Sequence, residues 1–226
     1  MKLKKHLIYI FVFFFCLQIK AQEDKEVKEK KNAIAVSFGS TGLGLEYARK
    51  LSNKLNARFV WHSLKIEDFE QEDVEIKSDL VDILANLEVS IVDIGIEYLP
   101  FKNSSFKLTA GLGILNKVNL NGVVTYNEDV VFGEVVITNE DAGEIIADIT
   151  WTDTAPYVGI GFGRAIPKNR LGFGIEFGSY ITSSPKIDLT ASNLLENTAS
   201  QKENLQESLE DFKFIPRIQI RIAYKF

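Results

Sequence analysis

The chain has 226 residues, with 26 basic and 31 acidic side chains and a net charge of −5, and 46% of its residues are hydrophobic. This acidic balance argues against nucleic acid as a partner. Cys16 is the only cysteine and falls within a predicted export signal, so the exported chain would have no thiol for a disulfide, a nucleophile or a metal site. The remainder suits a single domain.

Residues 1–21 have the pattern of a secretory signal peptide. Three lysines in the first five residues precede an apolar run at residues 7–17, and Ala21 offers a small side chain at the expected cleavage site. The run is too short to span a bilayer comfortably. Lipoprotein processing at Cys16 is disfavoured, because Phe15 precedes it instead of a small residue. Cleavage after Ala21 would remove four lysines and no acid, which changes the net charge from −5 to −9.

A charged leader at residues 22–32 precedes a domain that we expect to span residues 33–226. Through this domain apolar and polar residues alternate with the period of two that is typical of β-strands. The expected strands lie at residues 33–39, 43–51, 56–66, 86–99, 105–117, 155–164, 170–181 and 213–226. In the last of them, one face holds Ile218, Ile220, Ile222, Tyr224 and Phe226, and the other holds Arg217, Gln219, Arg221, Ala223 and Lys225.

These strands predict an all-β fold, an antiparallel up-and-down β-barrel of about eight strands. The polar face is rich in glycine and poor in Asp, Asn, Ser and Thr, which favours a narrow lumen over a wetted surface. Aromatic residues near strand ends fit the interfacial girdles of membrane barrels; they are Tyr98, Phe101, Tyr157, Tyr180, Tyr224 and Phe226. We therefore predict a transmembrane barrel of the outer-membrane type. The alternative is a soluble periplasmic lipocalin-like binding barrel.

The connections between these strands alternate in length, as they do in outer-membrane barrels. Short ones at residues 52–55, 100–105 and 166–170 should be periplasmic, and long ones at 67–84, 119–153 and 182–212 should be extracellular. In the last connection, Leu205 and Leu209 predict a short surface helix within residues 201–212. Residues 40–42 could instead form a bulge inside one long first strand. The missing strand would then come from the 119–153 connection, where 130–138 and 145–151 are hairpin-like. We predict eight strands, with ten as the alternative.

Several segments resemble strand motifs of small outer-membrane barrel proteins. They are TAPYVGIGFG at 154–163, GFGIEFG at 172–178 running into 184–189, and EYLPF at 97–101 with FKLTAGL at 106–112. Over most of residues 33–226 the chain is similar to the broad OmpA/OmpW-like group of outer-membrane β-barrel proteins. The resemblance implies a barrel in the outer membrane of a Gram-negative bacterium, and it implies no activity because the group is functionally diverse.

Phe226 ends the sequence, and apolar residues occupy alternate positions back to Ile218. This pattern resembles the terminal signal read by the outer-membrane assembly machinery. An exposed strand can pair with a strand of the insertase, and its alternating side chains then set the register. The alternative is an ordinary edge strand that ends in phenylalanine.

The residues that could carry chemistry form no catalytic pattern. His62 is the only histidine after the signal, and Ser63 points to the opposite face of a strand, so the two cannot form a dyad. Six acids cluster at residues 67–75 without the spacing or central glycine of a calcium loop. Glycine pairs such as Gly172 and Gly174 lie within strands and precede no helix, unlike nucleotide loops. We therefore expect no catalytic, cofactor-binding or metal-binding residues.

Charges of both signs fall on the face that we expect to line the lumen. These residues are Lys107, Glu176, Arg217 and Arg221, together with Glu46, Arg58, Asp93 and Glu97. Buried charges need partners, which favours a filled lumen over an open pore. We therefore expect a non-enzymatic barrel with an envelope structural or interaction role, or one that passes small apolar solutes through a lateral opening. The alternative is a membrane-embedded lipid-modifying enzyme.

The expected partners are outer-membrane lipids and lipopolysaccharide, and the assembly machinery through the strand that ends in Phe226. We expect a monomer that binds no nucleic acid. Because acids concentrate in the long connections, we also expect weak, non-selective Ca²⁺ or Mg²⁺ association there, at ~10⁻⁴–10⁻³ M.

Overall fold

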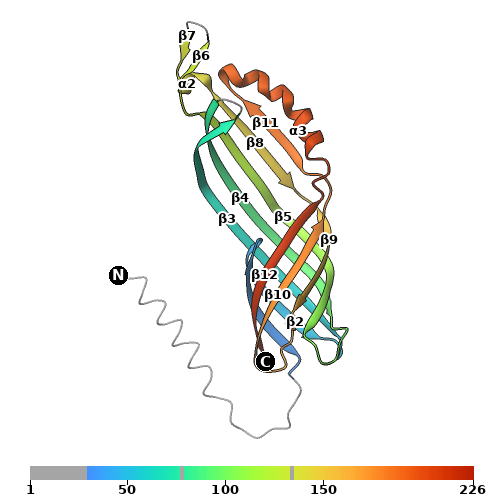
Figure 1. Cartoon of the computed structure of the whole chain (residues 1–226). Coiled ribbons are helices and arrows are strands. Elements are labelled where there is room, and N and C mark those ends of the chain that lie inside the picture. The colour runs from blue at the N-terminus through green and yellow to red at the C-terminus, as the bar shows by residue number, and fades with distance from the viewer. Residues whose placement is uncertain (1–29, 77–78, 133–134) are drawn as a thin grey trace, which may run out of the picture. The chain divides into compact units, whose positions relative to one another are not determined.

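Eight antiparallel strands of this computed structural model close into a ring, drawn in Figure 1. The structure describes residues 30–76, 79–132 and 135–226, so the expected signal peptide and most of the leader lie outside the described residues. The ring strands are β1 (Asn32–Gly39), β2 (Gly42–Lys50), β3 (Leu55–Ile76), β4 (Asp79–Tyr98), β5 (Phe106–Tyr126), β9 (Thr154–Phe162), β10 (Leu171–Ile181) and β12 (Phe214–Lys225). Strand β12 pairs with β1 and closes the ring, with Ile222 opposite Val36.

The ring confirms the predicted all-β barrel and its eight strands. Residues Ser40 and Thr41 form a tight turn, and Gly42 follows with φ of +85°, a conformation that favours glycine. The ten-strand alternative is wrong for the ring. Strands β6 (Val130–Phe132) and β7 (Val135–Ile137) pair only with each other, as a separate hairpin.

Strands β3, β4 and β5 run far beyond their predicted ends, so residues 67–76 and 79–84 belong to paired strands where we expected a loop. Two further strands extend this sheet, because β8 (Glu144–Trp151) pairs with the second half of β5 and β11 (Lys186–Ala191) pairs with β8. The prediction failed because the dense acids of this segment suggested a loop, whereas charged residues also suit the wetted outer face of a strand.

The result is a closed lower barrel that continues upward as an open sheet of β3, β4, β5, β8 and β11 (Figure 1). We call the end with β6–β7 and the helices the upper end, and the end with the C-terminus the lower end; the β1–β2 turn lies between them, at the top of the closed barrel. Strand β2 pairs with β3 only as far as Ser63, so no strand within the described residues pairs with the upper half of β3 on that side.

A helical segment follows β11 at the upper end and consists of the 3-10 helix η1 (Asn193–Gln201) and the α-helix α3 (Lys202–Ser208). Helix α3 confirms the short helix predicted in this connection. The Lys202 ammonium donates to Asp188 of β11 at 2.7 Å, and this hydrogen bond and charge lower the pKa of the Asp188 carboxyl. A single helical turn, α2 (Asn139–Ala142), precedes β8. None of the helices in the described part of the chain is long and apolar enough to cross a membrane.

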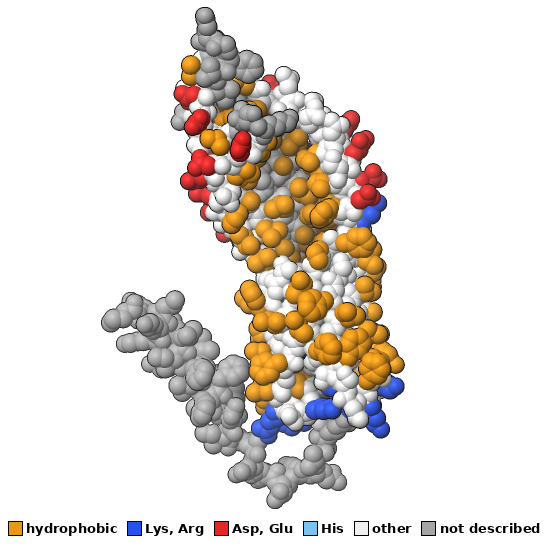
Figure 2. Space-filling model, in the orientation of Figure 1, with side chains coloured by type: hydrophobic (Ala, Val, Ile, Leu, Met, Phe, Trp, Pro, Cys, Tyr) orange, Lys and Arg blue, Asp and Glu red, His pale blue; other side chains and the backbone are white. Residues whose placement is uncertain are grey.

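Charge is sorted along the length of this domain. Residues 65–90, 116–153 and 183–213 make up the upper part and hold 23 acids and six bases, a net charge of −17. Elsewhere in residues 33–226 there are only four acids, and all four are buried in the lumen. The lower end carries bases, which Figure 2 shows as a blue band: Arg49, Lys50, Lys54, Lys102, Arg164, Lys168, Arg170 and Lys225.

Candidate functional site

The lumen of the lower barrel is filled by a network of charged side chains centred on Glu176. The Arg58 and Arg217 guanidinium groups donate to this carboxylate at 2.7 and 2.8 Å, and the Lys107 ammonium lies 2.5 Å from it. The hydroxyl of Tyr157 also donates to it at 3.0 Å. Glu176 is fully buried, so these cations and hydrogen bonds, to which Thr109 and Gln219 add one each at 3.3 Å, compensate for the cost of removing the carboxylate from water.

The other three acids of the lumen network are Glu46, Asp93 and Glu97, of which Glu97 lies at the lower mouth and is described below. Glu46 accepts from Arg58 and Arg221 at 2.9 and 2.7 Å. Asp93 accepts from Arg217 and, at 2.9 Å, from the hydroxyl of Tyr180. All eight lumen charges predicted from the sequence are buried here, four acids and four bases, so the network is neutral apart from His62.

Two tyrosines in the network correct an expectation, because we assigned Tyr157 and Tyr180 to an interfacial girdle. Both face the lumen, and Tyr180 is completely buried. Inner-face glycines make room for them. A Cβ at Gly113 would lie 2.5 Å from the Tyr180 ring, and one at Gly178 would lie 2.2 Å from the Tyr157 hydroxyl. The alternation of the sequence already indicated this orientation, because Tyr180 and Glu176 are both at even positions of β10 and therefore lie on the same face of the strand.

The lower mouth of the barrel is closed by the turn between β9 and β10. The Ala165 backbone N–H donates to both oxygens of the Glu97 carboxylate, at 2.8 and 3.0 Å, and Asn56 donates to the same group at 2.9 Å. Ala165 and Ile166 are buried with Ala33 and Ala48 of the first two strands. Sequence reasoning missed this closure because nothing local to a short turn indicates that it folds into the lumen.

An apolar layer, the floor, lies above the lumen network. It consists of Val89, Ile91, Leu115 and Val118, buried against Tyr157 and Tyr180, with Trp151 packed on the same cluster. The barrel is therefore closed by three successive layers, namely the lower turn, the charges and the floor. This arrangement of the described residues supports a filled lumen.

His62 lies where the lumen network meets the floor. Its Nδ1 is 3.4 Å from the Thr41 hydroxyl, and its Nε2 is 3.2 Å from both Arg217 and Asp93. Ser63 is exposed on the outer face, as predicted. A hydroxyl, an imidazole and a carboxylate thus lie in sequence, but His62 is 0% and Thr41 3% exposed. A substrate could not reach this hydroxyl without opening the floor, so the geometry favours a structural role.

Above the floor the two faces of the strands exchange their character. On β4, Ile94 and Ile96 are exposed on the outside of the lower barrel, and Asp93 points into the lumen. Higher on the same strand the inward positions are apolar, and the outward ones are mostly polar, with Asp82, Asn86 and Glu88 beside Leu84. A wall that is apolar outside and polar inside thus becomes polar outside and apolar inside.

We call the concave apolar face of this upper sheet the cup. Cross-strand pairing aligns its side chains in rows, as in the row Leu87–Leu120–Ile149–Ile187. Figure 2 shows apolar side chains gathered in this hollow, with acidic side chains along its sides. The cup is lined by Leu64, Ile66, Phe69, Val81, Ile83, Leu87, Leu120, Val124, Ile145, Ile149, Ile187 and Leu189. Near its top a cavity of about 140 Å³ remains beside Leu195 of η1.

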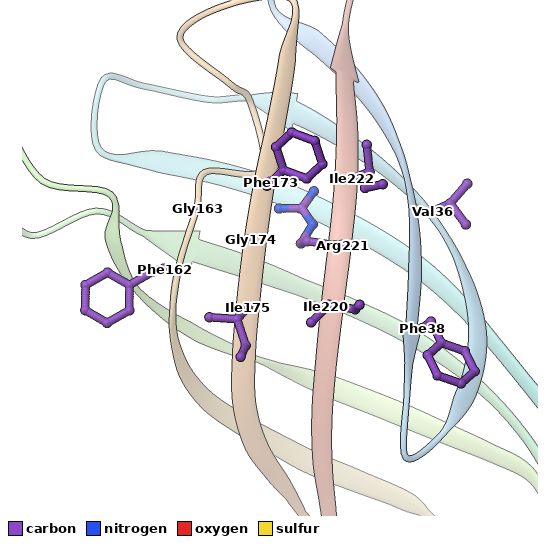
Figure 3. A pocket seen from close by; sticks show the side chains of 10 residues that line it. All are labelled: Val36, Phe38, Phe162, Gly163, Phe173, Gly174, Ile175, Ile220, Arg221 and Ile222. Carbon is purple, nitrogen blue, oxygen red and sulfur yellow. The ribbon is translucent and has the colours of Figure 1, made fainter.

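A second depression, of about 580 Å³, lies on the outside of the lower barrel (Figure 3). Apolar side chains from β1, β9, β10 and β12 surround it, including Phe38, Phe162 and Phe173, and Gly163 and Gly174 leave it open. It is part of the exposed apolar belt, and the one charged side chain that lines it, Arg221, is already paired with Glu46 in the lumen at 2.7 Å. We therefore regard the cup as the candidate functional site.

The six acids of residues 67–75 lie on the upper part of β3 and its bulges. In the described residues, no group of three or more His, Cys, Asp or Glu side chains is placed to hold a metal ion. The upper acids instead give the outside of the cup its negative charge.

Comparison with known proteins finds similarity of fold and no similarity of sequence to a known family. No family model and no curated protein matches the sequence. Among solved structures, Acinetobacter baumannii CarO is similar with a TM-score of 0.62 and 18% identity, covering 89% of this chain and 100% of that one. Acinetobacter baumannii CarO2 has a TM-score of 0.64 and 16% identity, covering 88% of this chain and 100% of that one. At this identity the likeness shows an antiparallel β-barrel fold, and membership of the OmpA/OmpW-like group stays a prediction.

Proposed function

We propose that this protein spans the outer membrane as a closed, non-enzymatic barrel and that the cup is its extracellular binding surface for apolar solutes. The observation that carries this proposal is the exchange of apolar and polar faces along the same strands. A belt of exposed apolar side chains around the lower barrel suits acyl chains. Polar outward side chains on the upper sheet suit water, and they leave the apolar cup facing inward.

The charge distribution supports an orientation. The lower end, with its bases and the C-terminus, would face the periplasm, and the acidic upper part would face the medium. Lipopolysaccharide at the outer surface is anionic, so divalent cations would bridge it to the upper acids only weakly, at ~10⁻⁴–10⁻³ M. Insertion would use β12, whose outward side chains end in Tyr224 and Phe226.

Fractionation and gel mobility test the proposal. We expect the protein to fractionate with outer membranes and to change its mobility when heated, as folded membrane barrels do. In a planar bilayer it should give no large steady conductance, because three layers close the lumen. Recovery of the whole protein in the soluble periplasm would contradict the membrane assignment, and a large conductance would contradict the closed lumen.

The enzyme alternative makes a separate prediction about His62. If the protein modified lipids through this histidine, His62→Ala would change the lipid composition as a null strain does. We expect the lipid composition of the His62→Ala strain to equal that of the wild type. A composition that matches the null strain would favour the enzyme.

A further inference from the structure

The cup has an open side. The β1–β2 turn lies at Ser40 and Thr41, and above Ser63 no strand in the part of the chain that the structure describes pairs with β3 on the β2 side. Apolar side chains at this edge are solvent-accessible, with Ile66, Phe69 and Ile76 exposed by 41, 59 and 45%. A ligand could therefore enter sideways, at the level where the exposed belt of the lower barrel ends.

The cup is also long enough for an extended apolar group. Inward positions on β4 run from Leu87 to Val81, a rise of about 20 Å at roughly 3.3 Å per residue. Gly122, between them on β5, adds no side chain, and a Cβ there would meet nothing within 4 Å. The cavity beside Leu195 shows that the helical segment does not fill the upper end.

The mouth of the cup carries negative charge without matching bases. We call the acids at the upper ends of β3, β4 and β5 the acidic rim: Glu72, Asp73, Glu75, Asp82, Glu128 and Asp129. Glu75 and Asp82 lie on the outward side of their strands, as Glu88 does, so the rim surrounds the mouth of the cup from the outer face of the sheet. Lower acids such as Glu67, Glu88 and Asp188 pair with lysines. The rim acids form no ion pair with any basic residue that the structure describes; Asp73, Asp82 and Asp129 each accept one hydrogen bond from a neutral group, so the negative charge of the rim is not neutralised there.

We infer that the cup binds a cationic amphiphile, with its apolar body along the inner face and its cationic head at the acidic rim. The inference rests on the proposed function and adds the charge of the ligand. A net charge of −17 over the upper part attracts cations and repels fatty acids and other anionic amphiphiles. Salt screens this field beyond about 8 Å at physiological ionic strength, so the rim acids supply most of the selectivity.

Quenching of Trp151 fluorescence measures this binding. Trp151 packs on the floor of the cup, and the only other tryptophan, Trp61, is exposed on the outer belt, so a Trp61→Phe background isolates the cup signal. The full-length protein is placed in nanodiscs of zwitterionic phospholipid and titrated with 12-bromododecyltrimethylammonium or with 12-bromododecanoate. We expect saturable quenching by the cation, with an affinity at least about tenfold above that of the anion, since several exposed charge contacts together reach this size.

Two variants separate binding in the cup from partition into the bilayer. Gly122→Phe fills the cup and should abolish saturable quenching, whereas Val123→Phe adds the same ring to the opposite face of β5 and should leave it unchanged. Equal affinities for the two probes, or quenching that survives Gly122→Phe, would overturn the inference. If the protein fractionates with outer membranes and fails these tests, only the inference is wrong. Recovery in the soluble periplasm would instead defeat the proposed function.

Discussion

Replacing Glu176 by glutamine tests whether the lumen network holds the barrel together. The carboxylate is fully buried and receives Arg58, Arg217 and Lys107 at 2.7, 2.8 and 2.5 Å. Glutamine keeps the shape but removes the negative charge, which leaves the network with one uncompensated positive charge. Breaking a buried pair in this way costs about 3–5 kcal/mol, so we expect the free energy of unfolding of Glu176→Gln to fall by that amount.

Urea unfolding in lipid vesicles, followed by tryptophan fluorescence and by the heat-modifiable gel band, measures this loss. Glu88→Gln is the matched control, because its partner Lys117 and Glu88 itself are both exposed, and it should cost less than about 1 kcal/mol. Adding Lys107→Met to Glu176→Gln restores neutrality and should recover part of the stability. The reasoning is refuted if Glu176→Gln costs no more than Glu88→Gln, or if the second substitution only adds to the damage.

Three further predictions concern assembly, pH and register. Deleting Phe226 should reduce insertion far more than Lys225→Ala does, because the first change strikes the outward apolar series; equal folding yields would remove the assembly-signal interpretation. The pKa of Asp188 is lowered by Lys202, so their contact is complete above the pKa of an unfolded aspartate and is lost as pH falls through the lower folded value. Protease cleavage near α3 should therefore increase at acid pH, and Asp188→Asn should show the higher cleavage at every pH; a pH dependence that persists in this variant would contradict the assignment. Strand β5 has a bulge at Asn116, an extra residue between Leu115, which pairs with Ile91, and Lys117, which pairs with Ser90. Deleting Asn116 should turn the upper half of β5 over, which would make the upper sheet sensitive to protease while the barrel still shows heat-modifiable mobility. Resistance equal to the wild type would show that the bulge does not set the register.

The lower barrel was predictable because lipid-facing strands repeat one simple pattern. Apolar side chains at alternate positions located the lower-barrel portions of all eight ring strands to within a few residues, although the upper ends of β3, β4 and β5 were missed. The polar residues between them identified the lumen charges. Position along a strand gave no such guidance for Tyr157 and Tyr180, since an aromatic near a strand end can face either side. A better indicator was that each tyrosine occupies the same set of alternate positions as the inner-face residues of its strand.

The upper sheet was missed although its sequence carries strand signals. Val81, Ile83 and Leu87 alternate with Asp82, Leu84, Asn86 and Glu88, but they occupy odd positions, whereas the apolar residues Ile94 and Ile96 below occupy even ones. A search for one continuous apolar face therefore ends where the faces exchange. Contacts between distant segments, such as that of Glu97 with the β9–β10 turn, lie beyond any local pattern.

Two neighbouring strands achieve the exchange of faces in different ways. On β4 the backbone is regular and the sequence changes, so that apolar residues move from even positions such as Ile94 to odd positions such as Val89. On β5 the apolar residues stay at even positions, from Leu112 to Leu120, and an extra residue, Asn116, turns the strand over between them. Both changes fall at one height, since Ile91 pairs with Leu115 just below the bulge. A chance irregularity would not require a compensating change in the neighbouring sequence. The coincidence therefore argues that the boundary between an apolar exterior and an apolar interior is a built feature of the fold, and it defines the level at which we expect the membrane surface to meet the barrel.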